Sequence, residues 1–162
     1  MKIVFLGNPN VSVSILDTLL KTKHDIVGVV SNSPKISGRG LKKRYTPVGL
    51  YAINKKLDLL CLSSFKDEKL YRALKKLDPD LFIVVAFKII PQKFLNLPKY
   101  GAINLHASLL PSYRGASPIQ YALLNGDKKT GVTTFFMDNK IDNGKIIMQK
   151  EFKINDNDNY ES

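Results

Sequence analysis

The chain has 162 residues, of which 44% are hydrophobic, and a formal net charge of +11. A chain of this length buries roughly 70% of its unfolded surface, which is enough for one domain with a sizeable core. The single cysteine, Cys61, excludes an internal disulfide, and the apolar run before Gly7 is too short for a secretion signal. No apolar stretch reaches transmembrane length, so we expect a cytoplasmic protein with no membrane partner.

Apolar periodicity predicts alternating strands and helices. Strands are expected at 2–6, 25–30, 59–62, 81–87 and 102–106, and helices at 11–20, 47–57, 67–77, 91–95 and 118–124. Two further strands, at 132–137 and 145–154, are expected as antiparallel additions at an edge. The pattern predicts an α/β fold with an open, mostly parallel twisted sheet, helices on both faces, and a site at the carboxyl ends of its strands.

The positive charge suits a polyanionic partner, since clustered Lys and Arg release counterions from phosphates. Most of the basic residues are lysines, however, and dispersed lysines also occur as ordinary solvated surface. The stronger signal is a group of four cations within six residues, beside two glycines: Arg39, Lys42, Lys43 and Arg44. This cluster predicts a basic finger that contacts nucleic-acid phosphates.

Two polar side chains, Asn104 and His106, interrupt the apolar strand at 102–106. Residues i and i+2 of a strand point the same way, so the two are expected to converge. An amide and an imidazole at the end of a strand can stabilise an oxyanion and move protons. A core histidine that is hydrogen-bonded by the asparagine explains the same two residues without catalysis.

Other site chemistries fail on spacing. Gly7 is followed by Asn-Pro-Asn where a dinucleotide-binding turn needs further glycines, so this asparagine turn is expected to cap the next helix. Two histidines and one cysteine cannot build a zinc site of usual spacing, so no metal is expected. Ser108 and Ser112 lack the Gly-x-Ser-x-Gly turn of a serine hydrolase.

A set of linked motifs spans the whole chain. In order they are the opening 1–9, the loop 34–44, the segments 104–111 and 113–119, Asn125-Gly126-Asp127, the segment 130–133 and Asp142-Asn143-Gly144. Together they resemble the formyltransferase family that uses 10-formyltetrahydrofolate, whose fold is Rossmann-like. Within it the resemblance is closest to the members that formylate methionyl-tRNA, because the Gly38–Gly40 loop and the segment 114–119 favour that acceptor over glycinamide ribonucleotide.

The resemblance implies that Asn104, His106 and Asp142 are catalytic. A neutral α-amino group would attack the formyl carbon, while Asn104 and a cationic His106 stabilise the oxyanion. Asp142 would orient His106, favour its charged form and help to pass the proton to the departing folate nitrogen. From the residues alone, Asp142-Asn143-Gly144 is also typical of a structural hairpin turn. Asp138 is the rival carboxylate, although it lacks a glycine two residues on.

The resemblance also implies a folate pocket lined by backbone and apolar groups. Its predicted lining is Phe87 together with Ser108, Leu109, Leu110 and Pro111. The chain departs from the family pattern where Phe87-Lys88 replaces tyrosine and glycine. Lys88 is therefore expected either to stiffen a turn or to bring a cation toward the folate tail.

Initiator methionyl-tRNA is the implied acceptor, held by the basic finger. Two alternatives remain open: a sugar-nucleotide N-formyltransferase, and a non-catalytic RNA-binding module on the same fold. The catalytic domain is expected to occupy residues 1–154, and residues 155–162 to begin a linker or a truncated helix. Those members of the resembled family that formylate methionyl-tRNA usually carry a second, β-rich domain, so we expect a carboxy-terminal tRNA-binding domain to be missing here.

Overall fold

The structure, a computed structural model, describes residues 1–37, 42–160 and 162, and the chain divides into two compact units, Met1–Ala102 and Ile103–Ser162. The strands of the first unit are β1 (Lys2–Gly7), β2 (Asp25–Asn32), β3 (Lys35–Ser37), β4 (Lys42–Arg44), β5 (Leu59–Leu62) and β6 (Leu81–Val85). Its helices are α1 (Asn10–Leu20), α2 (Pro47–Asn54), α3 (Glu68–Leu77) and α4 (Gln92–Leu95). The second unit holds β7 (Ala102–His106, which starts at the boundary), α5 (Pro118–Leu124), β8 (Lys129–Phe136) and β9 (Ile146–Lys153).

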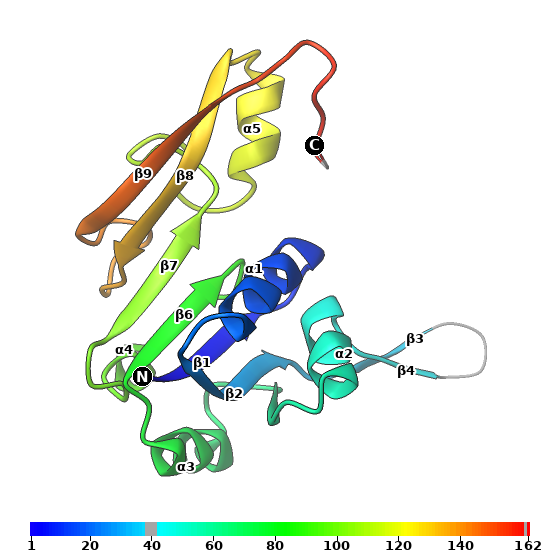
Figure 1. The fold of residues 1–162 in the computed structure, drawn as a ribbon, viewed down its shortest axis with the longest axis vertical. Helices are drawn as coiled ribbons and strands as arrows, with labels where there is room; N and C mark the ends of the chain where they lie inside the picture. The colour runs from blue at the N-terminus through cyan, green and yellow to red at the C-terminus, as the bar shows by residue number, and fades with distance from the viewer. Residues whose placement is uncertain (38–41, 161) are drawn as a thin grey trace. The chain divides into compact units, whose positions relative to one another are not determined.

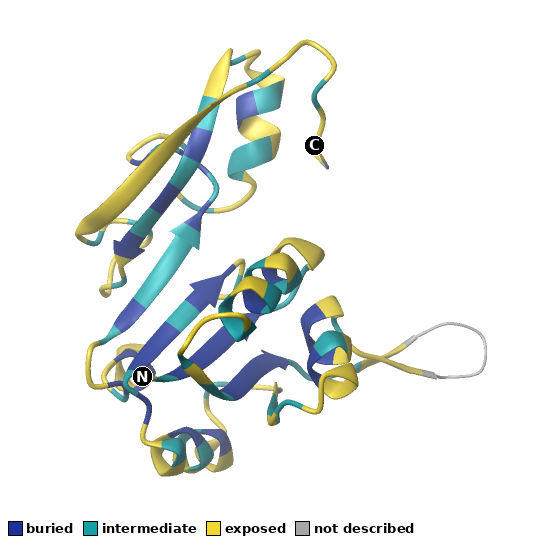
Figure 2. Ribbon diagram, in the orientation of Figure 1, coloured by how far each residue is buried: buried dark blue, intermediate teal, exposed yellow. Residues whose placement is uncertain are grey.

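The first unit is built on four parallel strands in the order β5-β2-β1-β6 (Figure 1). Successive residues of a strand face opposite sides of the sheet, and Val4 and Phe5 of β1 are both 0% exposed. Both faces of the sheet are therefore covered at β1, and Figure 2 colours most of this strand dark blue. This confirms the predicted α/β fold with a parallel sheet buried on two sides.

Local chemistry sets the ends of the helices in the first unit. The side chain of Thr46 accepts a hydrogen bond from the amide of Gly49, and Pro47 fits the first turn of α2. The helix ends at Asn54, earlier than the predicted residue 57, because Lys56 adopts a left-handed conformation with φ +56°. In α3 the carboxylate of Asp67 caps the amide of Lys69.

The turn after β1 does not cap α1 through an asparagine, so that prediction was wrong. The N-cap position is Pro9, which makes no side-chain cap. The side chain of Asn8 instead accepts hydrogen bonds from the amide of Asn32 at 2.9 Å and from the hydroxyl of Ser31 at 3.1 Å. Asn8 therefore ties the turn to the end of β2.

The second unit contains the antiparallel strands β7-β8-β9, as predicted for the last two strands. Burial alternates along β8, whereas every residue of β9 is exposed (Figure 2). Helix α5 contacts β8 and ends at the Asn125 cap, and Gly126 adopts φ +67°. This confirms the predicted Asn-Gly helix end, because glycine accepts the left-handed conformation without steric cost. Among the residues described, no helix is long and apolar enough to span a bilayer.

Candidate active site

His106 is the last residue of β7 and only 7% of its surface is exposed. Its Nε2 atom lies 2.8 Å from the backbone carbonyl oxygen of Tyr113. A carbonyl oxygen can only accept a hydrogen bond, so Nε2 must carry a proton and donate it. The core-histidine alternative required a hydrogen bond between His106 and the amide of Asn104. In the structure the acceptor is instead the loop carbonyl of Tyr113.

The other ring nitrogen of His106 faces Asp142. The distance from Nδ1 to Oδ2 of Asp142 is 3.6 Å, which is an ion-pair distance and too long for a hydrogen bond. The same Oδ2 accepts a hydrogen bond from the amide of Gly115 at 2.8 Å, and Nε of Arg114 donates to the Asp142 carbonyl at 2.9 Å. Asp142 is therefore held by the loop that follows β7, and the carboxylate is presented to the imidazole.

The turn that contains Asp142 depends on its glycine. Asp142 adopts a left-handed φ of +46°, and a Cβ atom at Gly144 would lie 1.6 Å from the carbonyl oxygen of Phe136. No side chain fits at residue 144 without moving the backbone. Asp138 is exposed and accepts a hydrogen bond from the amide of Lys140 at 2.8 Å. The structure thus brings Asp142, and not the rival Asp138, to His106.

Asn104 is half-buried on β7, two residues before His106 and opposite Phe135 of β8. Side chains two residues apart leave the same face of a strand, so its amide and the imidazole share one side of β7. This arrangement agrees with the predicted pair, and both residues belong to the second unit together with Asp142.

The predicted folate segment after β7 is anchored from the neighbouring strands. The hydroxyl of Thr133 on β8 donates to the carbonyl of Ser108 at 2.6 Å and accepts from the amide of Leu110 at 3.1 Å. Nε2 of Gln149 on β9 donates to the Leu110 carbonyl at 2.8 Å, and the hydroxyl of Ser108 donates to the Ser112 carbonyl. Because these polar groups are already bonded within the protein, the segment can offer a ligand mainly apolar surface. Pro111 follows Leu110 through a cis peptide bond and is exposed.

Phe87, the remaining predicted folate residue, lies in the first unit just after β6. It is half-buried, and its ring meets that of Phe65 edge-on at 6.4 Å between centroids. The left-handed residue here is Ala86, with φ +48°, so the strand ends at Val85 and not at the predicted residue 87. Lys88 shows no such conformation, and its Nζ lies 5.9 Å from the Phe65 ring centroid. A lysine therefore fits at residue 88 without a left-handed backbone.

The basic cluster lies partly on a short hairpin, where a plain loop was expected. Strands β3 and β4 pair antiparallel, and Lys35 stands directly opposite Arg44. Lys43 and Arg44 are exposed, and Lys42 begins β4. Arg39 lies outside the described residues. Two cations opposite one another repel, so this hairpin favours a bound anion.

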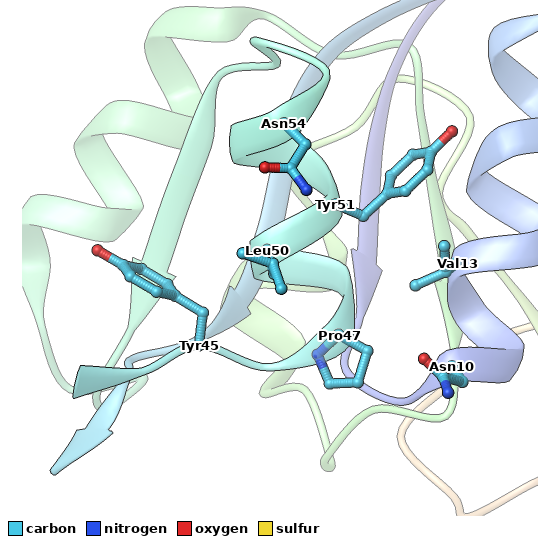
Figure 3. Close-up of a pocket in the computed structure, with 7 residues that line it drawn as sticks. All are labelled: Asn10, Val13, Tyr45, Pro47, Leu50, Tyr51 and Asn54. Atoms are coloured by element: carbon cyan, nitrogen blue, oxygen red, sulfur yellow. The ribbon is translucent and has the colours of Figure 1, made fainter. Parts of the chain in front are cut away.

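A shallow hollow of about 360 Å³ lies between α1 and α2 in the first unit (Figure 3). Its lining residues are Asn10, Val13, Tyr45, Pro47, Leu50, Tyr51 and Asn54. None of them is a carboxylate, an imidazole or an amine, so the titratable groups of its lining are the phenols of Tyr45 and Tyr51. Burial and a hydrogen bond to Asp17 raise the pKa of Tyr51 to about 12, which keeps its phenol neutral.

Among the residues that the structure describes, no group of three or more His, Cys, Asp or Glu side chains could hold a metal ion. Within the described part of the chain, the His106 site therefore has no cluster of metal ligands.

Comparisons with known proteins point to one family. The model of a family described as formyl transferase matches residues 1–162. A methionyl-tRNA formyltransferase from Flavobacterium psychrophilum is 50% identical over 160 residues, which are 98% of this chain and 51% of the relative. One from Bacteroides thetaiotaomicron is 46% identical over 161 residues, 99% of this chain and 50% of the relative. The chain spans about half the length of the curated relatives it matches.

Solved structures show the same fold. A phosphoribosylglycinamide formyltransferase from Anaplasma phagocytophilum superposes with a TM-score of 0.79 at 26% identity, covering 99% of this chain and 76% of that one. The corresponding enzyme from Bacillus halodurans gives a TM-score of 0.78 at 18% identity, covering 99% and 84%. Since the family model covers every residue from 1 to 162, the chain belongs to the formyl transferase family.

Proposed function

We propose that this chain transfers the formyl group of 10-formyltetrahydrofolate to the α-amino group of initiator methionyl-tRNA, in the cytoplasm. The observation that supports it best is the buried His106 at the end of β7, with a protonated Nε2 and with Nδ1 facing the Asp142 carboxylate. The acceptor follows from the names of the relatives that are 46–50% identical over nearly the whole chain.

In the proposed reaction the neutral amine attacks the formyl carbon, and a new C–N bond forms while the carbonyl electrons move to the oxygen. Asn104 donates through its amide N–H to that oxyanion, and a positively charged His106 stabilises it. The bond from carbon to the folate N10 then breaks, and the proton lost by the amine passes to N10 with the help of Asp142. A hydrogen-bond donor to an oxyanion typically lowers the activation barrier by roughly 3 kcal/mol.

The folate donor is proposed to contact apolar groups of the second unit. These are Leu109, Leu110 and Pro111, in a segment whose shape Ser108 maintains through its bond to Ser112. Phe87, in the first unit, stays a prediction from the family resemblance. The bonds from Thr133 and Gln149 to Leu110 hold the segment in one conformation, which lowers the entropy lost on binding.

The tRNA is proposed to contact the hairpin β3–β4 through Arg39, Lys42, Lys43 and Arg44. The exposed cations at Lys43 and Arg44, and the like-charge pair of Lys35 and Arg44, favour a polyanion at this surface. Figure 1 shows the two strands extending away from the parallel sheet of the first unit.

A single transfer assay tests the proposal. The chain is mixed with 10-formyltetrahydrofolate and with charged initiator tRNA, and formyl-methionine is measured after mild hydrolysis of the ester. Formylation of the tRNA is expected. Formylation of an amino sugar nucleotide in its place, or of neither acceptor, would overturn the proposed function.

A further inference from the structure

The carbonyl group that holds His106 belongs to a residue in an unfavourable backbone conformation. Tyr113 has a left-handed φ of +54°, which is sterically unfavourable for a residue other than glycine. Such a conformation persists only where the surroundings impose it. The loop on either side is fixed by other groups, because Ser108 binds the Ser112 carbonyl and Asp142 binds the Gly115 amide.

Tyr113 is fixed by its own phenol. The hydroxyl donates to Oδ2 of Asp127 at 2.6 Å and accepts from Nδ2 of Asn125 at 2.8 Å. Both partners lie where α5 ends, and backbone bonds hold that end: the Asp127 amide donates to the Ala122 carbonyl at 3.0 Å. The hydrogen bond to Asp127 raises the pKa of Tyr113, so the phenol keeps the proton that it donates.

We propose that Tyr113, Asn125 and Asp127 form a positioning cluster that fixes the tautomer and orientation of His106. The cluster holds the Tyr113 carbonyl 2.8 Å from Nε2, which keeps the proton of the neutral ring on Nε2 and turns Nδ1 toward Asp142. Its effect on formyl transfer rests on the proposed function, whereas its effect on the imidazole does not.

The chain is well suited to a direct test, because it has only two histidines, His24 and His106. In protein labelled with ¹⁵N-histidine, His24 serves as the internal reference and the variant His24→Gln assigns it. The wild type is expected to show a slowly exchanging Nε2–H proton for His106. In Tyr113→Phe, which keeps the ring and removes only the hydroxyl, that signal is expected to be lost.

Matched variants separate positioning from general loss of structure. Asp127→Ala should behave like Tyr113→Phe, whereas Asp127→Asn keeps an acceptor oxygen and should restore the Nε2–H signal. Tyr121→Phe removes a hydroxyl from an exposed tyrosine on α5 and should change nothing. Circular dichroism tests whether each variant is folded. If Tyr113→Phe is unfolded, the comparison of Asp127→Ala with Asp127→Asn tests the positioning cluster instead.

In the transfer assay, Tyr113→Phe and Asp127→Ala should lower kcat about tenfold and leave KM for the folate donor unchanged, since a misplaced catalytic group slows the chemical step. An identical Nε2–H signal in wild type, Tyr113→Phe and Asp127→Ala would overturn the positioning cluster. If the signal changes as expected but the wild type transfers no formyl group, the cluster stands and the proposed function fails.

Discussion

Oδ2 of Asp142 lies 3.6 Å from Nδ1 of His106 and accepts a hydrogen bond from the Gly115 amide at 2.8 Å. The carboxylate is thus bound by the loop and only faces the imidazole. The hydrogen bond that orients His106 is made with the carbonyl of Tyr113 instead. Of the three roles predicted for Asp142, the contact that orients His106 thus comes from Tyr113 in this structure, and charge stabilisation and proton transfer stay predictions for Asp142.

Replacement of Asn104 or of His106 by alanine should lower turnover by more than tenfold, because the first variant lacks a donor to the oxyanion and the second lacks the cation that stabilises it; losses of roughly 100-fold are typical. Both residues lie at the end of β7, so the fold should remain. Turnover is measured by single-turnover formylation, and folding by circular dichroism. His24→Ala is the matched control and should keep full activity. Unchanged turnover in a folded Asn104→Ala or His106→Ala variant would remove that residue from the oxyanion site.

Asp142→Asn separates charge from geometry. Asparagine tolerates a left-handed φ, and its amide oxygen can still accept from Gly115, so the turn should persist. We expect kcat to fall by about 100-fold or more, by analogy with carboxylates that support a catalytic imidazole. Asp138→Asn, at an exposed turn, should be neutral. The opposite result, a loss for Asp138→Asn only, would move the catalytic role to Asp138.

Simultaneous replacement of Arg39, Lys42, Lys43 and Arg44 by alanine should weaken tRNA binding and flatten its salt dependence. For every phosphate that the variant no longer neutralises, the slope of log K against log salt should become shallower by about 0.9. Folate binding should not change. The control removes the same charge from exposed residues of α3: Lys69, Arg72, Lys75 and Lys76. Equal slopes for the two quadruple variants would show that the hairpin does not bind the phosphates.

Ionisation of Tyr51 should lower the free energy of unfolding of the first unit at alkaline pH. Burial, together with the hydrogen bond to Asp17, raises its pKa from 10.0 to about 12 in the folded state. A raised pKa means that the folded state binds the proton more tightly, so this stabilisation is complete below pH 10 and is lost as the pH rises through about 12. Urea unfolding of wild type and Tyr51→Phe measures it. The difference between them should be constant to pH 10 and then shrink, and a constant difference up to pH 12 would contradict the assignment.

Much of the fold followed from the sequence because the signals are local. The strand β1, the start of α3 and the Asn125-Gly126 end of α5 depend on neighbours within a few residues, and all were predicted within a short distance of their observed limits. The Asn-x-His spacing on β7 was equally readable, because it needs only the twofold period of a strand.

Tertiary structure decided which partners these side chains have. Asn8 does not cap α1, because its side-chain oxygen is bound instead by Asn32 and Ser31, 24 and 23 residues away. Likewise, no local pattern signals that the Tyr113 carbonyl holds His106, or that Asp127 holds the phenol of Tyr113, because these bonds depend on how the loop returns to β7 and to the end of α5. The sequence alone therefore determined most of the strands and helices and the shared side of Asn104 and His106, whereas contacts between distant segments formed the hairpin β3–β4 and set the orientation and the tautomer of the imidazole.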